Sequence, residues 1–242
     1  MTSSVQQASS ISESVEKVLT ACPGLRQDTA AILGDMYGSG LLFGTKSSEP
    51  VKINPAVGMN IEQGAVVNQF LRESAFERSL EIGFGYGFST VWILDALRDH
   101  KNASHVAVDP YELNHWQGVG IRQVERLTFP KKFDWKEEFS IHALSDFVRN
   151  GEKFDFLYLC GGQRFDDVIV NFCLSDKLVR VDGVIAMDDL WLDSAKTALS
   201  FILTNMSYEL VSQPSKNIAF LKKLQDDNRK WNHYNKFEVY PK

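Results

Sequence analysis

The chain has 242 residues, of which 44% are hydrophobic and 24% are charged, and its formal net charge is -5. The length is enough for one α/β domain with a sizeable core, or for a domain with a small appendage. The composition is ordinary for a soluble globular protein, and the acidic balance argues against a general nucleic-acid footprint. No stretch reaches the ~18 apolar residues of a membrane span. The three cysteines are odd in number and lack metal-type spacing. We therefore expect reduced thiols in a cytoplasmic protein.

The first part of the chain predicts helices. The N-terminal stretch MTSSVQQASS is polar, does not resemble a signal peptide, and is expected to be disordered. ISESVEKVLTAC and RQDTAAILGDMYG have helical patterns, the second ending at Gly38. Breaks between Ser39 and Pro55 predict a loop, and IEQGAVVNQFLRES again has apolar residues at helical spacing. We divide the chain into an N-terminal helical cap or lid, residues 1–54, and a main domain, residues 55–242.

Apolar strand patterns then alternate with helical patterns. The predicted strands are RSLEIG, SHVAVDP, FDWKEEFSI, FDFLYLC and GVIAMDD, and YELVSQPSKNIAFLKKL adds two strands joined around Pro214 and Ser215. This alternation predicts a Rossmann-like, doubly wound, mostly parallel sheet of seven strands, with an antiparallel edge strand and an N-terminal helical extension. Ligands bind such sheets beyond the carboxyl ends of the strands. Asp109, Cys160, Asp188 and Asp189 all lie at predicted strand ends.

The stretch EIGFGYGFST, residues 81–90, places glycines at positions 83, 85 and 87 directly after the first of these strands. Such glycines let a backbone bend sharply and approach a ligand closely. A dinucleotide fingerprint needs a third glycine where this chain has Phe88. A phosphate-binding P-loop needs a lysine, which does not follow Gly85 or Gly87. Both of these loop types are therefore excluded.

The ordered set EIGFGYG, VAVDP, FDFLYL and GVIAMDD resembles the class I S-adenosylmethionine-dependent methyltransferases, over roughly residues 55–224. The resemblance implies S-adenosylmethionine as the cofactor, with its methionine part against Gly83, Gly85 and Gly87. It also places the ribose hydroxyls on Asp109, and a carboxylate can accept hydrogen bonds from both. The helix start near Ser89 offers free N–H groups that suit the methionine carboxylate.

Five residues complete the predicted cofactor site. Ser89 is expected to add a hydroxyl donor, and Glu81 to orient the cofactor ammonium group. Resemblance to the catechol-type O-methyltransferases implies that His142 and Ala143 lie beside the adenine ring; for His142, a helix-start residue at a half-exposed pocket is the alternative. Cys160, at the end of the fourth strand, is also assigned to the cofactor site.

The stretch CGGQRFDD departs from both related O-methyltransferase groups. The catechol type binds a divalent cation through an Asp ending strand four and Asp-Asp or Asp-Asn ending strand five, and a bacterial group has D-G-x-H-x-[FY]-[DE] after strand four. Here Cys160 stands at the Asp position, and Gln163 stands at the His position, which is also that of the catechol-type Lys. Asp188 and Asp189 match the strand-five ligands. Because a thiol is a poor ligand for Mg²⁺, we predict no catalytic divalent metal.

Methyl transfer from a sulfonium needs alignment above all, and a base helps when the acceptor is a hydroxyl. The candidates for this base are Asp188, Asp189, His142 and His115, and Gln163 is assigned to the same catalytic set. Capping of the following helix is the alternative for the two aspartates. For His115 the alternative is an exposed loop histidine.

The segment DPYELNHWQGVG, residues 109–120, resembles the D-P-F-Q-x-x-x-W-x-G-x-G stretch of the bacterial group. It is expected to form a loop over the cofactor, with Trp116 and Trp191 as apolar walls. By analogy with the family, the segment Leu41 to Met59 is expected to act as a lid over a small organic substrate. The N-terminal helices are candidates for pairing two subunits into a homodimer.

The sequence thus predicts a methyltransferase acting on a small molecule, at a hydroxyl of a specialised metabolite or a sugar. Nucleic acid and membranes are not expected as partners. One alternative keeps the cofactor but uses it for a non-methyl reaction such as cyclisation or decarboxylation. Another is a non-catalytic partner subunit, which the glycine loop and Asp109 argue against.

Overall fold

Seven strands form the central sheet. The structure, a computed structural model, describes residues 2–54, 57–129 and 132–239. Residues 1, 55 and 242, which mark predicted segment boundaries, lie outside the described residues. The strands are β3 Arg78–Ile82, β4 Ser104–Val108, β5 Lys132–Lys136, β6 Phe154–Leu159, β7 Val179–Met187, β8 Tyr208–Ser215 and β9 Ile218–Lys223. Their order across the sheet is β5-β4-β3-β6-β7-β9-β8.

The sheet has the predicted mixed direction. Strands β3 to β7 pair in parallel, and β9 runs antiparallel to both β7 and β8. The β8–β9 pair therefore adds an antiparallel hairpin at one edge, with β9 one place in from the end. Its turn lies at Lys216 and Asn217, two residues later than the predicted position around Pro214. The Rossmann-like fold class is confirmed.

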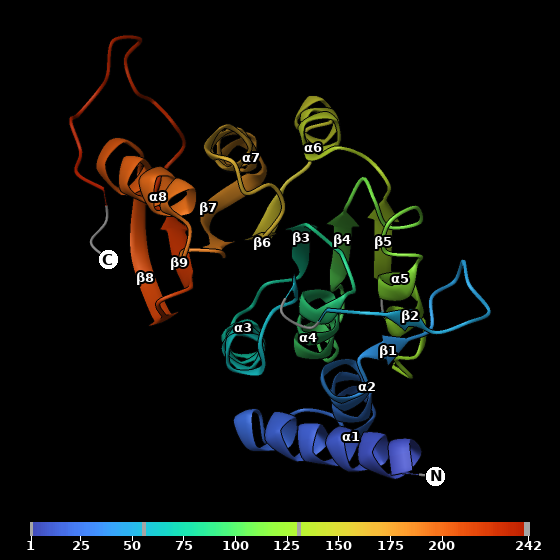
Figure 1. Cartoon of the computed structure of the whole chain (residues 1–242). Helices are drawn as coiled ribbons and strands as arrows, with labels where there is room; N and C mark the ends of the chain where they lie inside the picture. Colours follow the sequence, from blue (N-terminus) through green and yellow to red (C-terminus); the bar gives the residue numbers. More distant parts are fainter. Residues whose placement is uncertain (1, 55–56, 130–131, 240–242) are drawn as a thin grey trace.

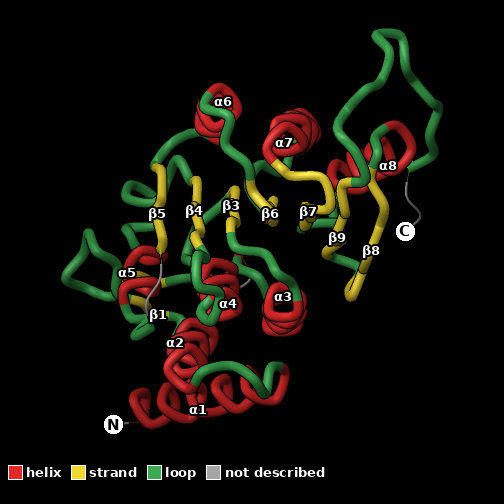
Figure 2. Tube along the Cα trace, turned by 180° about the vertical axis from the view of Figure 1, so that it is seen from behind, coloured by secondary structure: helices red, strands yellow, loops and turns green. Residues whose placement is uncertain are grey.

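Helices cover both faces of the sheet (Figures 1 and 2). They are α1 Thr2–Ala21, α2 Gln27–Gly38, α3 Ile61–Glu73, α4 Phe88–Leu97, α5 Val119–Glu125, α6 Ser140–Arg149, α7 Phe165–Leu178 and α8 Asp193–Asn205. Helices α3, α4 and α5 lie on one face, with α2 and then α1 stacked outside them, and α6, α7 and α8 lie on the other. No helix in the described part of the chain is long and apolar enough to cross a membrane.

Strand β6 divides the core into two halves. Its side chains alternate, so that Phe156 and Tyr158 pack with the α3 and α4 side, whereas Leu157 and Leu159 pack with the α6, α7 and α8 side. All six β6 residues are buried, as expected for a central parallel strand covered on both faces. This placement puts the carboxyl end of β6 in the middle of the sheet edge where a ligand is expected.

The N-terminal part differs from two predictions. Helix α1 begins at Thr2, so the prediction that the first ten residues are disordered is wrong. Val18 on α1 belongs to the same apolar core as Trp92 on α4. This burial stabilises a helix that the polar residues at its start do not predict. Within the predicted loop Ser39 to Pro55, two short strands, β1 Leu41–Leu42 and β2 Val51–Lys52, pair antiparallel.

A buried carboxylate joins the N-terminal helices to the main sheet. Asp95 on α4 is fully buried and accepts hydrogen bonds from the Thr29 hydroxyl at 2.9 Å, the Asn68 amide at 3.1 Å and the Arg98 guanidinium at 2.6 Å. The backbone N–H of Arg26 adds a fourth donor at 3.3 Å. One side chain thus holds α2, α3 and α4 together.

Replacing this carboxylate should destabilise the whole fold. Asp95→Ala leaves the guanidinium of Arg98 without its buried counter-charge, so we expect the free energy of unfolding to fall by roughly 3–5 kcal/mol. Urea denaturation followed by circular dichroism measures the loss. Asp99→Ala is the matched control, because Asp99 also pairs with Arg98, at 3.3 Å, but is 80% exposed, and such pairs contribute little. Equal losses in the two variants would contradict the role of Asp95.

Candidate functional site

The predicted strand-end residues lie in one row along the sheet edge. Four residues that follow directly after a strand of the parallel sheet donate their backbone N–H to a carbonyl of the neighbouring strand. Each such bond extends the hydrogen-bond ladder between two parallel strands by one. These bonds, 2.9–3.0 Å long, join Gly83 to Val108, Cys160 to Ile82, Asp109 to Lys136 and Asp188 to Leu159. Residues distant in the sequence therefore meet at one edge.

The glycine loop has left-handed backbone at all three predicted positions. The φ angles are 98° at Gly83, 53° at Gly85 and 83° at Gly87, a region in which glycine is strongly favoured. A Cβ atom on Gly83 would lie 2.9 Å from the backbone nitrogen of Gly161, whereas one on Gly85 would meet nothing within 4 Å. Gly83 therefore allows close packing of two loops, and Gly85 borders open space.

The Asp109 carboxylate lies against this loop. It accepts hydrogen bonds from the backbone N–H groups of Gly85 and Tyr111, at 2.9 and 2.8 Å, and from the indole of Trp116 at 3.3 Å. Burial raises the pKa of Asp109, and the amide donors oppose this shift. A carboxylate offers about four acceptor sites, so these three donors leave capacity for a ligand hydroxyl. Trp116 also packs edge-on against Tyr86, with ring centres 4.9 Å apart.

Glu81 and Ser89 bond to each other. The fully buried Glu81 carboxylate accepts from the hydroxyls of Ser89 and Thr90 at the start of α4, and Nε2 of His105 lies 3.1 Å away. This buried cluster fastens α4 to β3 directly behind the glycine loop. Contact of Glu81 or Ser89 with a cofactor stays a prediction. His105 was not anticipated, because a histidine within an apolar strand carries no motif.

The two predicted site histidines lie in different exposed places: His115 in the loop before α5, and His142 in the first turn of α6. His142 is exposed and Ala143 is buried in the first turn of α6, where both backbone N–H groups donate to the Phe139 carbonyl. His115 is exposed, and its ring centre lies 4.4 Å from that of Trp116. Neither histidine is among the residues that line the cavity at the ends of β6 and β7, so their predicted roles stay predictions.

Asp188 is enclosed by protein donors. Its carboxylate, 6% exposed, accepts from the Tyr158 hydroxyl, from the side-chain amides of Gln63 and Asn217 at 2.8 and 3.0 Å, and from the Asp189 backbone N–H at 2.8 Å. Burial raises the pKa of Asp188 to about 6, and the Tyr158 hydroxyl is the largest of the effects that oppose this shift. Three of these donors bond to Oδ1 and the Tyr158 hydroxyl bonds to Oδ2, so both carboxylate oxygens already have protein partners.

The sequence does not predict the side-chain donors around Asp188, because they come from three distant segments. Gln63 lies on α3, Tyr158 lies on β6, and Asn217 lies in the β8–β9 turn. Asn217 also accepts the backbone N–H of Trp191 at 3.2 Å. One signal in the sequence is the tyrosine in the mostly apolar FDFLYLC, because the hydroxyl of a buried tyrosine needs a partner.

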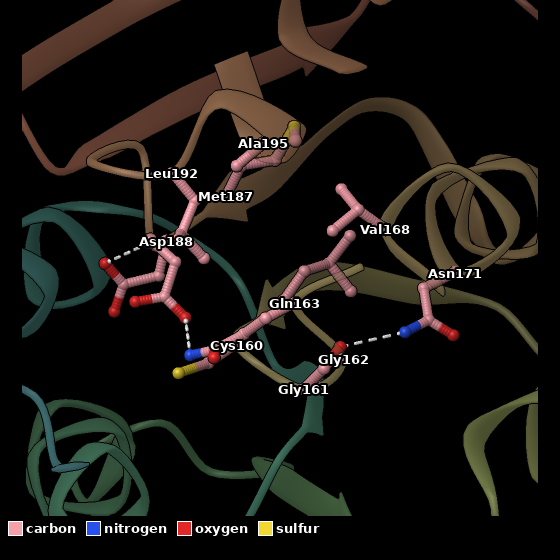
Figure 3. Close-up of a pocket in the computed structure, with 12 residues that line it drawn as sticks. Cys160, Gly161, Gly162, Gln163, Val168, Asn171, Met187, Asp188, Leu192 and Ala195 are labelled. Carbon is pink, nitrogen blue, oxygen red and sulfur yellow. Dashed lines mark hydrogen bonds between the residues drawn. The ribbon is translucent and has the colours of Figure 1, made fainter. Parts of the chain in front are cut away.

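Asp189 is held differently, at the edge of solvent. Its backbone has a φ of 60°, and its carboxylate accepts from the indole N–H of Trp191 at 2.9 Å and from the Gln163 amide at 3.1 Å. Figure 3 shows Gln163 beside Cys160 and Asp188 in this region. The following helix α8 starts after Leu192 without a side-chain cap. The alternative prediction that the paired aspartates cap α8 is therefore wrong.

A cavity of about 190 Å³ opens next to these side chains. Its walls come from the segment before α3 and from the strand ends: Val57, Gly58, Met59, Asn60, Gln63, Cys160, Asp188, Asp189, Trp191 and Asn217. Burial and the neighbouring carboxyls of Asp188 and Asp189 raise the pKa of the Cys160 thiol, so Cys160 is a neutral thiol. No group of three His, Cys, Asp or Glu side chains within residues 2–54, 57–129 and 132–239 is arranged to hold a metal ion.

The predicted lid contacts two different regions. Val57, Gly58 and Met59 line the cavity, whereas the backbone N–H groups of Thr45 and Lys46 donate to the carbonyls of Gly118 and Gln117, both at 3.2 Å. Gly118 in turn precedes α5, where a Cβ atom on Gly120 would lie 2.7 Å from the Gly85 carbonyl. Thr45 and Lys46 therefore hold the stretch that packs on the glycine loop.

Comparison with known proteins agrees with this geometry. Residues 80–190 match a family model described as a methyltransferase domain, whereas none of the curated proteins matches the chain. Three solved structures have a similar fold. The first is PaMTH1, a methyltransferase from Podospora anserina bound to S-adenosylhomocysteine. The second is TomG, an O-methyltransferase of tomaymycin synthesis from Streptomyces achromogenes, in complex with S-adenosylmethionine, and the third is an O-methyltransferase from Bacillus cereus in complex with S-adenosylhomocysteine.

These structures are distant in sequence and alike in fold. Identity is 14%, 16% and 18%, and the TM-scores are 0.56, 0.56 and 0.57, in the same order. The alignments cover 70%, 71% and 69% of this chain and 81%, 83% and 81% of the other. Residues 80–190 therefore resemble a methyltransferase domain in sequence, and the chain has the fold of these methyltransferases, as the resemblance to the class I S-adenosylmethionine-dependent methyltransferases predicts.

Proposed function

We propose that this S-adenosylmethionine-dependent enzyme transfers a methyl group to a hydroxyl oxygen of a small molecule, without a divalent metal ion. The observation that carries the proposal is the position of the Asp189 carboxylate. It borders a cavity at the same sheet edge as the glycine loop and Asp109, and it retains acceptor capacity after its two side-chain donors are counted.

The residues around the glycine loop fit the cofactor. Asp109 has acceptor capacity for a ribose hydroxyl, and the absence of a side chain at Gly85 leaves room beside it. The N-terminus of α4 carries unpaired N–H groups that favour a carboxylate. The cofactor supplies a methyl group on a sulfonium, which is already an activated leaving group. The protein therefore has to align the acceptor and remove its proton.

Asp189 is the best-placed base. Trp191 and Gln163 fix its carboxylate from two sides, which holds one geometry without neutralising the negative charge. Its role is to accept the proton of an acceptor hydroxyl as the oxygen becomes a nucleophile. Asp188 is unsuited to this task because all four of its hydrogen-bond donors come from the protein. Gln163 accordingly orients the base and does not replace it.

The donor set argues for a reaction without a metal. Mg²⁺ requires several oxygen ligands in near-octahedral geometry. Here the first of the two strand-five carboxylates is bonded to Tyr158, Gln63 and Asn217, and a neutral thiol, Cys160, stands at the strand-four position. Only Asp189 remains able to bind an ion, and one monodentate carboxylate is a weak site for Mg²⁺.

The similar structures support oxygen as the methylated atom. Both TomG and the Bacillus cereus protein are described as O-methyltransferases. Because each is less than 20% identical to this chain, the similarity establishes the shared fold, and for the methylated atom it is supporting evidence only. The competing proposal, a non-methyl reaction that keeps the cofactor, is favoured by the absence of a His or Lys at position 163. Release of S-adenosylhomocysteine with each turnover distinguishes the two.

The predicted ribose contact makes cofactor affinity depend on Asp109. Asp109→Ala removes the charged acceptor of a ribose hydroxyl hydrogen bond, so we expect the dissociation constant of S-adenosylhomocysteine to rise by about 10-fold or more. Titration calorimetry measures this change. Asp134→Ala, which removes an exposed acid on the neighbouring strand β5, should bind like the wild type. Equal affinity of all three proteins would contradict the assignment.

Removing the base should slow turnover and spare cofactor binding. With an accepted phenol, catechol or sugar, Asp189→Asn should lower the rate of S-adenosylhomocysteine release by about 100-fold or more. The dissociation constant of S-adenosylhomocysteine should stay unchanged. Asp193→Asn, an exposed acid at the start of α8, is the control and should keep the wild-type rate. Full activity in Asp189→Asn would rule out Asp189 as the base.

Chelation should leave the reaction unaffected. After treatment with EDTA, the rate of S-adenosylhomocysteine release should equal that of the untreated enzyme, and added Mg²⁺ should not raise it. A catechol-type methyltransferase in the same assay shows that the chelator works. A loss of more than about tenfold that Mg²⁺ restores would show a bound metal in the reaction.

A further inference from the structure

Glu112 is a buried carboxyl group in the loop that joins Asp109 to α5. It has no exposed surface. Its Oε1 atom accepts the backbone N–H of Ile121 at 3.1 Å, and its carbonyl accepts the N–H of Gly118 at 2.8 Å. Its Oε2 atom has no hydrogen-bond partner in the described structure. A buried carboxylate oxygen without a donor is costly, whereas a neutral carboxyl group costs much less.

The surroundings of Glu112 favour the neutral form. Burial is the largest cause, the Asp109 and Glu137 carboxyls add like charge, and together they raise the pKa of Glu112 to about 8, against the backbone donor of Ile121. Other charged groups on the neighbouring elements are engaged elsewhere or point to solvent. Arg122 on α5 pairs with Glu125, His115 is exposed on the same loop, and Lys46 is exposed on the lid segment.

Glu112 fixes the α5 end of the cofactor loop, residues 109–120. Its side chain holds the N–H of Ile121, and its backbone carbonyl holds that of Gly118. These bonds set the start of α5, where Gly120 packs against the Gly85 carbonyl. The stretch that this loop resembles has Gln at position 112, and a protonated carboxyl group is close in shape and charge to that amide.

We propose that Glu112 is a positioning residue that must be protonated to hold residues 109–120 in the cofactor-binding arrangement, so that affinity for the cofactor is lost as Glu112 ionises. The inference rests on the proposed function only in taking Asp109 as the ribose acceptor. Ionisation would place a third negative charge beside Asp109 and Glu137, with one oxygen left unpaired. The loop must then open to water, and the packing of Gly120 on the glycine loop is lost.

The matched variant is Glu112→Gln, which keeps the shape and cannot ionise. We titrate S-adenosylhomocysteine into wild type and variant by calorimetry between about pH 6 and about pH 9.5. If only the protonated form binds, the wild-type dissociation constant should rise about thirtyfold relative to that of the variant between about pH 7 and about pH 9.5. Taking the ratio removes the titration of the ligand itself. Glu125→Gln, an exposed acid on α5, should follow the wild type.

Thermal unfolding supplies a readout that needs no cofactor. Because the pKa of Glu112 is raised from 4.5 to about 8 in the folded protein, the folded state holds a proton that the unfolded state releases in this pH range. The stability of the wild type should therefore fall relative to that of Glu112→Gln as the pH rises from about 4.5 to about 8. Above about pH 8 the difference in Tm between the two proteins should level off. Glu112→Met, neutral and of similar length, should behave like Glu112→Gln and guards against a specific defect of the amide.

The outcomes separate the two proposals. A constant ratio of dissociation constants, with binding intact, overturns the positioning role of Glu112 and leaves the proposed function standing. A Tm difference that does not change with pH also overturns it, because Glu112 would then not be a neutral group at physiological pH. Failure of wild type and variant to bind S-adenosylhomocysteine at any pH overturns the proposed function, and the positioning role with it.

Discussion

The parallel ladder past the strand ends is the constraint on which the site depends. One additional backbone bond per strand aligns Gly83, Asp109, Cys160 and Asp188 along a single edge. This row leaves no room for a side chain at Gly83, whose Cβ atom would press on the backbone of Gly161. Register in a sheet is an all-or-none property, because a shift of one residue turns every side chain to the other face. The glycine loop and the cavity beside Asp188 are therefore positioned by the same set of bonds.

Buried carboxyl groups organise the regions around this edge, and each is balanced in its own way. Glu81 is held by two hydroxyls and lies beside His105, Asp95 is held by a guanidinium, an amide and a hydroxyl, and Asp188 is held by four neutral donors. A buried charge needs such partners. Glu112, with an oxygen left unpaired, is the exception that marks a protonated group.

The sequence predicts the features that local pattern controls. Alternating apolar strands and helices give the sheet, and the spacing of Gly83, Gly85 and Gly87 with Asp109 identifies the cofactor class. The sequence does not predict the hydrogen-bond partners of a buried carboxylate. Gln63, Tyr158 and Asn217 donate to Asp188 from distant segments that only the fold brings together. Nor does it predict the start of α1 at Thr2, because the polar N-terminal residues carry no apolar pattern and the helix depends on packing further along, around Val18.

The enclosure of Asp188 has a mechanical consequence. Its Oδ1 atom is bonded at once to α3 through Gln63 and to the β8–β9 turn through Asn217, and the same Asn217 holds the backbone of Trp191. Gln63, which lines the cavity, is thus connected through one carboxylate oxygen to the strand end that carries Asp189. Two walls of the cavity are held by the same side chain. A displacement of α3 would therefore alter the cavity and the surroundings of Asp189 together.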